Sequence, residues 1–135
     1  MTRSPNRLLG TLIGAAYVLL GLLGFSVTAG LGFFATEGGL LLGPLEVNPL
    51  QNIVHILIGS GLLLAGLSLT KAARTVNSVV GFGLLLLGFA GLLLAGTDLN
   101  ILAVNAADNV LHFASAVVLL LVGLGADKNP PAASA

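Results

Sequence analysis

Apolar residues dominate four long stretches of the sequence, and short polar segments separate them. The stretches cover residues 8–29, 50–69, 76–95 and 106–125. Each is close to the roughly 20 residues that an α-helix needs to cross a hydrocarbon core of about 30 Å. Strands of a membrane barrel would alternate polar and apolar residues, whereas the third stretch contains four consecutive leucines at 84–87. The first stretch is too long for the apolar core of a cleavable signal peptide, so the pattern predicts four membrane-spanning helices.

The composition supports this interpretation. Hydrophobic residues make up 56% of the 135 residues and charged residues only 7%, whereas a soluble domain carries about 25% charged residues. A soluble domain of this size cannot bury so much apolar surface. The five basic and five acidic residues cancel, which leaves no basic face for nucleic acid, and the absence of cysteine excludes thiolate metal sites and disulfides. We therefore expect an integral membrane protein with a single transmembrane domain over residues 1–125.

The basic residues indicate how the chain is oriented. They precede the first span, lie between the second and third, or follow the fourth, and they are Arg3, Arg7, Lys71, Arg74 and Lys128. The other two loops contain acidic residues and no basic residue. The positive-inside rule therefore predicts that both termini are cytoplasmic. The polar, proline-containing segment 126–135 is predicted to be a disordered cytoplasmic tail.

Two similar polar motifs open the second and fourth spans. Residues 47–55 and 104–112 both read Val-Asn-x-x-polar-Asn-x-x-His, at an offset of 57 residues. Glycines of the first and third spans match at an offset of 67, and they are Gly14, Gly21, Gly24, Gly81, Gly88 and Gly91. Parallel repeats are related by an axis along the membrane normal. We therefore expect an all-α four-helix bundle made of two tandem helical-hairpin repeats.

Polar residues recur on one face of the second and fourth spans. Successive helical residues advance by about 100°, so each asparagine lies close to the histidine that follows it on one stripe. A stripe facing lipid would cost several kcal/mol, so both stripes are expected to face inward. Each histidine should lie about 10 Å inside its helix start, near the outer face. The polar stripe and candidate ligand site comprises Asn52, His55, Asp108, Asn109 and His112.

Residues at the starts of these two spans fit a simpler role. Asn48 precedes Pro49, and Gln51 follows three residues after Asn48, as in an N-cap with a capping-box partner. Asn105 and Asp108 repeat the pattern, with an acid near the positive end of the helix. We therefore interpret Asn48, Gln51 and Asn105 as helix caps.

The glycines of the first and third spans predict close helix packing. The six named above share one face of each span, and Gly10 and Gly14 have the GxxxG spacing. A slot for a flat cofactor is the alternative interpretation of these faces. Tyr17 is expected to form a hydrogen bond with a neighbouring helix. The glycine-rich segment 30–45 is expected to lie at the outer interface as a short hairpin or helix.

Residues 43–59 resemble the signature of a bacterial family, domain of unknown function 4383. Its members are similar four-span membrane proteins with an Asn-Pro-x-x-Asn-x-x-His-x-x-x-Gly element and a later Asp-Asn-x-x-His. These elements correspond here to residues 48–59 and 108–112. This chain has Gln51 where members often have a histidine. The resemblance implies a multi-pass protein of the bacterial cytoplasmic membrane, and it implies no activity.

Three functions are consistent with these residues. The leading one is a structural or accessory membrane protein without a cofactor, whose partners are the bilayer and a larger membrane complex or a second copy of itself. The second is a redox protein in which His55 and His112 bind haem b. The third is a component of a small transporter or channel. An intramembrane hydrolase is disfavoured because no serine lies within the polar stripes.

Overall fold

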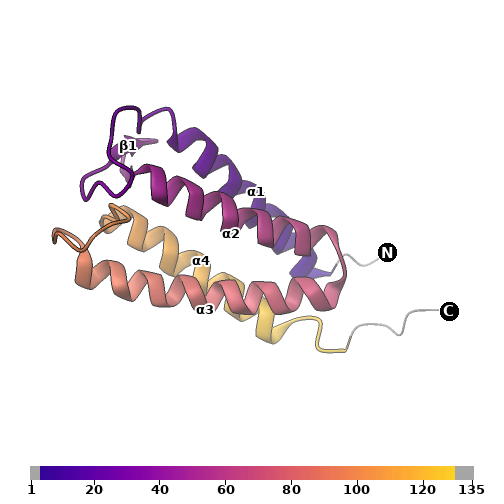
Figure 1. The fold of residues 1–135 in the computed structure, drawn as a ribbon. Helices are drawn as coiled ribbons and strands as arrows, with labels where there is room; N and C mark the ends of the chain where they lie inside the picture. The colour runs from indigo at the N-terminus through magenta and orange to yellow at the C-terminus, as the bar shows by residue number, and fades with distance from the viewer. Residues whose placement is uncertain (1–3, 130–135) are drawn as a thin grey trace.

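The computed structural model describes residues 4–129 and contains four long helices and a short two-stranded sheet. Their bounds are α1 Pro5–Gly24, β1 Gly39–Leu41, β2 Leu45–Val47, α2 Pro49–Leu67, α3 Thr70–Leu94 and α4 Ala106–Gly125. All four helices are long and apolar enough to cross a membrane, which confirms the four-helix membrane architecture. The helices run side by side, with α1 packed mainly against α2 and α3 mainly against α4 (Figure 1).

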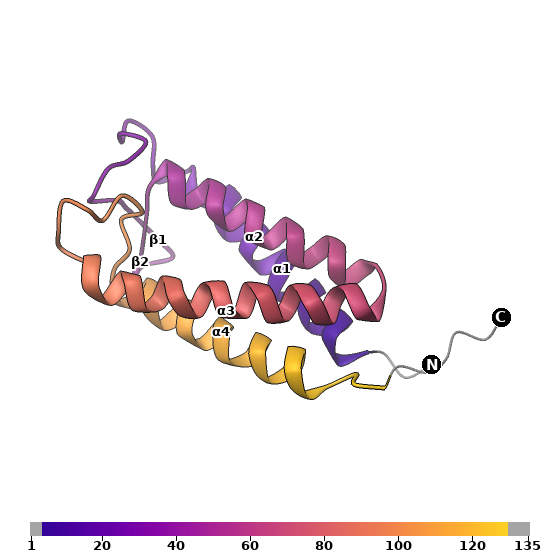
Figure 2. The same ribbon diagram turned by 60° about the horizontal axis from the view of Figure 1, so that its bottom comes forward.

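The two ends of the bundle are different. The sheet and the α3–α4 connection lie together at one end, called here the sheet end (Figures 1 and 2). The start of α1, the tight α2–α3 turn and the end of α4 lie at the other, called here the turn end. A hydrogen bond of 2.6 Å from the Ser4 hydroxyl to the Asp127 carboxylate joins the start of α1 to the segment after α4. The described ends of the chain therefore meet at the turn end.

Two helices start earlier than hydropathy predicts. α1 begins at Pro5 rather than residue 8, because the Ser4 side chain caps it by accepting a hydrogen bond from the Arg7 amide. α3 begins at Thr70 rather than residue 76, and its first turns contain Lys71 and Arg74. Lysine and arginine lower the hydropathy of this segment, but both are good helix formers, as is alanine. Hydropathy therefore marks the part of a helix that lies in lipid, and the helix itself is longer.

The end of α1 differs in the opposite direction. This helix stops at Gly24, five residues before the expected boundary at residue 29. The amides of Ser26 and Val27 bond to the carbonyl oxygens of Leu23 and Gly24, so the chain turns there instead of continuing. The apolar residues up to Ala29 belong to the connection toward the sheet.

The segment between α1 and α2 contains the antiparallel hairpin of β1 and β2. Gly39 pairs with Val47, and Leu41 pairs with Leu45. Leu42 and Gly43 form the turn with positive φ angles of 52° and 98°, a conformation that favours glycine. The fold is therefore helical with one small sheet, which an all-α description omits.

The distribution of buried and exposed apolar side chains in the bundle is that of a membrane protein. The centre is a small apolar core of Tyr17, Leu62, Leu84, Ala116 and Leu119. Large apolar side chains on all four helices are more than half exposed, among them Leu12, Leu57, Leu93 and Leu121. Such a surface would favour aggregation in water, and it is the surface expected of helices that face lipid.

Candidate functional site

The polar stripes of α2 and α4 lie inside the bundle toward the sheet end. Each of their residues is at most 4% exposed: Asn52, His55, Asp108, Asn109 and His112. The helical hydrophobic pattern places them there, because the opposite faces of both helices carry exposed aliphatic side chains. The stripes therefore form one buried polar cluster between the two helical hairpins.

The two histidines face each other across the bundle. Their ring centroids are 6.1 Å apart, with the ring planes at 65°. The Tyr17 ring packs edge-on against His55 at 5.4 Å, and its hydroxyl donates to Ser115 Oγ at 3.0 Å. Among the described residues, none of the four imidazole nitrogens has a hydrogen-bond partner. Asn52, Asn109 and Asp108 therefore form no hydrogen bond with these rings in that part of the chain.

The asparagines beside the histidines are packed against glycines instead. The Asn52 amide donates to Thr28 Oγ1 at 3.2 Å, while its side-chain oxygen lies against Gly24 without a donor. The Asn109 side-chain oxygen lies against Gly91 in the same way. A Cβ on either glycine would overlap that oxygen. These two glycines therefore make room for buried amides.

Asn48 joins three segments at the sheet end. Its side-chain oxygen accepts a hydrogen bond of 2.8 Å from the Gln51 amide, so Asn48 caps α2. Its side-chain nitrogen donates to the carbonyl oxygens of Ala35 at 2.8 Å and Ile101 at 2.7 Å. One fully buried amide thus connects α2 with both loops of this end.

Asp108 has two roles at the start of α4. With Asn105 it forms a reciprocal capping box, in which each side chain accepts a hydrogen bond of 3.0 Å from the other residue's backbone. The same carboxylate accepts from the backbone of Glu46 in β2 at 3.2 Å. The Asn105 amide nitrogen donates to the Pro44 carbonyl oxygen at 2.8 Å. This cap therefore also holds the hairpin against α4.

Gln51 differs from the expected capping-box partner. In the amide orientation that gives both of its groups a partner, its nitrogen donates to the carbonyl oxygens of Leu102 and of Glu46, the latter at 3.1 Å. The side chain therefore points to the loops and not back to the backbone of Asn48. The α3–α4 connection crosses the start of α2, which a sequence motif on α2 alone does not reveal.

A second buried polar cluster, at the turn end, escapes the sequence reasoning. The Asn77 amide donates to Asn6 O at 2.9 Å and Asn6 Oδ1 at 3.0 Å. The Asn6 amide nitrogen donates to Val122 O at 3.1 Å and Asp127 Oδ2 at 3.0 Å. Asn77 was detectable as an asparagine within a predicted span, whereas Asn6 precedes the first predicted span. This cluster joins α1, α3 and the segment after α4.

Asp127 belongs to the segment expected to be disordered. Burial, which raises the pKa of its carboxyl, is the largest single effect, but hydrogen bonds from Ser4 and Asn6 together outweigh it and hold that pKa below its usual value. The positive charge of Arg74 acts in the same direction. Asp127 is therefore tied to α1, and residues 130–135 of the expected tail lie outside the described part of the chain.

Comparison with known proteins bears on the family alone. A family model described as a domain of unknown function, DUF4383, matches residues 7–125, which is most of the chain and includes both Asn-x-x-His motifs. No curated protein and no solved structure matches the sequence. The resemblance of residues 43–59 and 108–112 is thereby confirmed, and this chain belongs to the DUF4383 family.

Proposed function

We propose that this chain is a structural or accessory protein of a bacterial cytoplasmic membrane, whose polar groups join helices and loops into one unit. The observation that carries the proposal is the use of Asn48, whose oxygen caps α2 and whose nitrogen binds both loops of the sheet end. An amide whose donors and acceptor are used by the backbone is not available to a ligand. The partners in this proposal are the bilayer and other membrane-embedded chains, and it includes no cofactor or enzymatic activity.

The stability of Asn48→Ser in detergent tests this role. Serine retains the cap but does not reach the two loop carbonyls, so we expect a loss of about 2 kcal/mol from two buried hydrogen bonds. Asn105→Ser is the matched control, because it also retains a cap and loses only one exposed bond to Pro44. Equal stability of Asn48→Ser and the unmodified protein would contradict the proposal.

The proposal includes a tandem repeat of two hairpins. The buried positions of α1 (6, 10, 14, 17, 21 and 24) match those of α3 at an offset of 67 residues. Six of the seven buried positions of α2 match those of α4 at an offset of 57. Chance would not align two independent sets of buried faces at the two offsets that relate the sequence motifs. This agreement supports the repeat.

The proposal also places the turn end in the cytoplasm. The described basic residues all belong to that end: Arg7, Lys71, Arg74 and Lys128. The positive-inside rule therefore supports a cytoplasmic turn end with both termini. Reporter fusions at Ala135 and within residues 36–47 test this orientation. We expect cytoplasmic activity from the first fusion and periplasmic activity from the second, and the reverse result would contradict it.

A second candidate function, metal binding, is favoured by the histidine pair. Two metal–nitrogen bonds of about 2 Å, plus about 1 Å from each nitrogen to its ring centre, give a centroid separation of about 6 Å when one nitrogen of each ring points at a shared ion. The observed separation of His55 and His112 is 6.1 Å, and their nitrogens are without hydrogen bonds among the described residues. Both rings are 1% exposed. One metal ion held by two imidazoles fits these values.

Haem b fits this pair less well than a bare ion. A porphyrin between the rings would need an open slot, yet Tyr17 packs directly on His55 and both rings are buried. The described basic residues, which would pair with propionates, lie at the other end of the bundle. In the described part of the chain no third histidine, cysteine or acid joins the pair as a ligand. Zinc takes four ligands, so monovalent copper, which accepts two, is the better match.

Titration of the detergent-purified protein with monovalent copper tests this second candidate. We expect one copper per chain, and none in His55→Gln or His112→Gln. Asn100→Ala, at a buried asparagine of the α3–α4 connection, is the control and should still bind copper. Absence of copper from the unmodified protein would contradict metal binding, and a Soret band after purification would indicate haem instead.

A further inference from the structure

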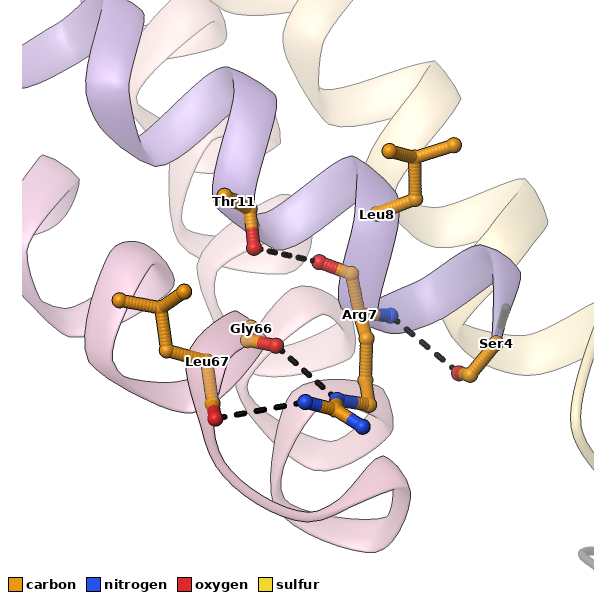
Figure 3. A pocket seen from close by; sticks show the side chains of 6 residues that line it. All are labelled: Ser4, Arg7, Leu8, Thr11, Gly66 and Leu67. Atoms are coloured by element: carbon orange, nitrogen blue, oxygen red, sulfur yellow. Dashed lines mark hydrogen bonds between the residues drawn. The ribbon is translucent and has the colours of Figure 1, made fainter. Parts of the chain in front are cut away.

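Two similar pockets lie at the turn end of the bundle. The first, of about 330 Å³, lies where α1 meets the end of α2 and is lined by Ser4, Arg7, Leu8, Thr11, Gly66 and Leu67 (Figure 3). The second, of about 310 Å³, lies where α3 meets the end of α4, and its lining includes Arg74, Ser78 and Gly123. Each pocket therefore has an arginine and at least one hydroxyl side chain from its first helix and a glycine from its second.

The arginines are held in the same way in both pockets. Arg7 donates from Nε to the Gly66 carbonyl oxygen at 3.2 Å, as Figure 3 shows, and Arg74 donates from Nε to the Gly123 carbonyl oxygen at 3.0 Å. The arginines differ by 67 residues and the glycines by 57, the offsets of the two sets of buried helix positions. A cation at a helix C-terminus is favoured by the exposed carbonyl groups there. The same device is therefore present at both hairpins.

Each guanidinium retains donors for another group. An arginine has five N–H donors in a planar fork. Arg74 uses only its Nε in hydrogen bonds with described residues, and Arg7 uses its Nε and one long bond of 3.4 Å from Nη2 to Leu67 O. Anchoring through Nε orients the fork, so that the remaining Nη donors match the geometry of two oxygens on one phosphate.

The pockets combine this charge with an apolar rim. Thr11 and Ser78 donate their hydroxyls to the carbonyl oxygens of Arg7 and Arg74, at 2.8 and 2.9 Å. Around them are aliphatic side chains that are 46–65% exposed, namely Leu8, Leu67, Val79 and Leu124. A charged base beneath exposed aliphatic side chains, at the end of a membrane helix, matches a phospholipid, whose phosphate lies at the interface and whose chains extend along the helices.

We propose that these pockets are two equivalent binding sites for the phosphate of an anionic phospholipid, one at each hairpin. The arginine Nη groups hold the phosphodiester, and the aliphatic rim covers the start of an acyl chain. Asp127 lies close enough to Arg74 to interact with its charge, and Lys71, which also lines the second pocket, offsets this negative charge. The inference is independent of the role proposed for the sheet end.

Native mass spectrometry of the detergent-purified protein, titrated with phosphatidylglycerol, tests the proposal. We expect two retained lipids per chain, one in Arg7→Gln or Arg74→Gln, and none in the double variant. Each lost site corresponds to a dissociation constant raised about tenfold, because a charge-assisted contact is removed. Lys128→Gln is the matched control, since it removes a positive charge at the same end outside both pockets, and it should retain two lipids.

Further arms separate lipid from free phosphate and from misfolding. Diacylglycerol with the same chains should not bind, and millimolar inorganic phosphate should not displace phosphatidylglycerol. Leu67→Trp fills the rim of the first pocket without altering an arginine, and we expect this variant to retain one lipid. It therefore tests the first pocket separately if an arginine variant fails to fold. The proposal would be overturned if Leu67→Trp and the double variant each retained two lipids. It would also be overturned if inorganic phosphate displaced phosphatidylglycerol, or if Lys128→Gln lost as much lipid as the arginine variants.

Discussion

The hairpin of α1 and α2 and the hairpin of α3 and α4 share a pattern of glycines but differ in how closely their helices approach. A Cβ on Gly14 would lie 2.5 Å from the backbone nitrogen of Leu63 and 2.7 Å from the carbonyl oxygen of Gly59. At the matching position, a Cβ on Gly81 would lie 3.0 Å from the Leu119 side chain. α4 has Ala116 where α2 has Gly59. The helices of the first hairpin therefore approach each other more closely at this level than those of the second.

The same comparison extends to the glycines two turns further toward the sheet end. A Cβ on Gly21 would meet the backbone oxygen of Asn52 at 2.5 Å, whereas a Cβ on Gly88 would meet the ring of Phe113 at 2.9 Å. In the second hairpin the glycine accommodates an aromatic ring, which then packs edge-on against Phe89. A glycine face thus allows close approach, and the residues of the opposite helix determine whether backbone or a side chain fills the space.

Substitution of the equivalent glycines should give the largest difference in stability between the two hairpins. Gly14→Ala places its Cβ against backbone that cannot move without separating the helices, so we expect a loss of about 3 kcal/mol of unfolding free energy in detergent. Gly81→Ala places its Cβ 3.0–3.1 Å from atoms of Leu119 and Leu120, which need to shift by only a few tenths of an ångström, so its loss should be about 1 kcal/mol. Gly61→Ala has open space around its Cβ and should be neutral or slightly stabilising. Equal losses at Gly14 and Gly81 would show that the two interfaces are equally close.

The cluster at the turn end breaks the symmetry of the hairpins, because α1 has Asn6 where α3 has Ala73. Asn6→Ala removes the bonds to Val122 and Asp127 and leaves the Asn77 amide with fewer acceptors. We expect a loss of about 2 kcal/mol in thermal or denaturant unfolding.

Ser78→Ala is the control for Asn6→Ala. It removes a hydroxyl that bonds only to its own helix, and it should cost less than about 0.5 kcal/mol. A loss for Asn6→Ala no greater than that of the serine variant would mean that this cluster does not join the hairpins.

The two histidines also distinguish the hairpins, because they occupy matching positions but have different neighbours. In the protein without metal, His55→Leu and His112→Leu each remove polar atoms that have no partner among the described residues, so both losses should be below about 1 kcal/mol. His55→Leu should cost more, by about 0.5 kcal/mol, since it also loses the edge-on contact with Tyr17. Denaturation in the presence of a chelator measures both. A loss of several kcal/mol from either variant would show that its imidazole is bonded.

The smallest expected effect concerns acid stability at the turn end. Because the pKa of Asp127 is held below its usual value, its carboxylate contributes stability that is present above its unfolded pKa and is lost as the pH falls through its folded pKa. Asp127→Asn should therefore be slightly less stable at neutral pH and lose less stability as the pH falls below about 4. Asp98→Asn, at an exposed carboxylate of the sheet end, is the control. Identical acid profiles of unmodified protein and Asp127→Asn would contradict the bonding of Asp127 in the membrane-embedded protein.

Much of the fold was predictable from the sequence because lipid around a chain restricts how its backbone can form hydrogen bonds. Spans of about 20 apolar residues have few ways to satisfy their backbone in lipid other than as helices. The N-caps of α2 and α4 were predictable for a similar reason, since Asn48 and Asn105 act within a single turn of chain. The sequence also identified the family, because the signature residues are contiguous.

Tertiary structure decided what depends on a second segment. Gln51 has the spacing of a capping-box residue, yet its side chain bonds to carbonyl oxygens of the α3–α4 connection and of β2 instead. Asn6 lies outside the hydrophobic pattern, and only the approach of α3 and of the segment after α4 gives it partners. The glycines of the two hairpins are alike in the sequence and differ in contact, because the distance between two helices is set by the side chains of both.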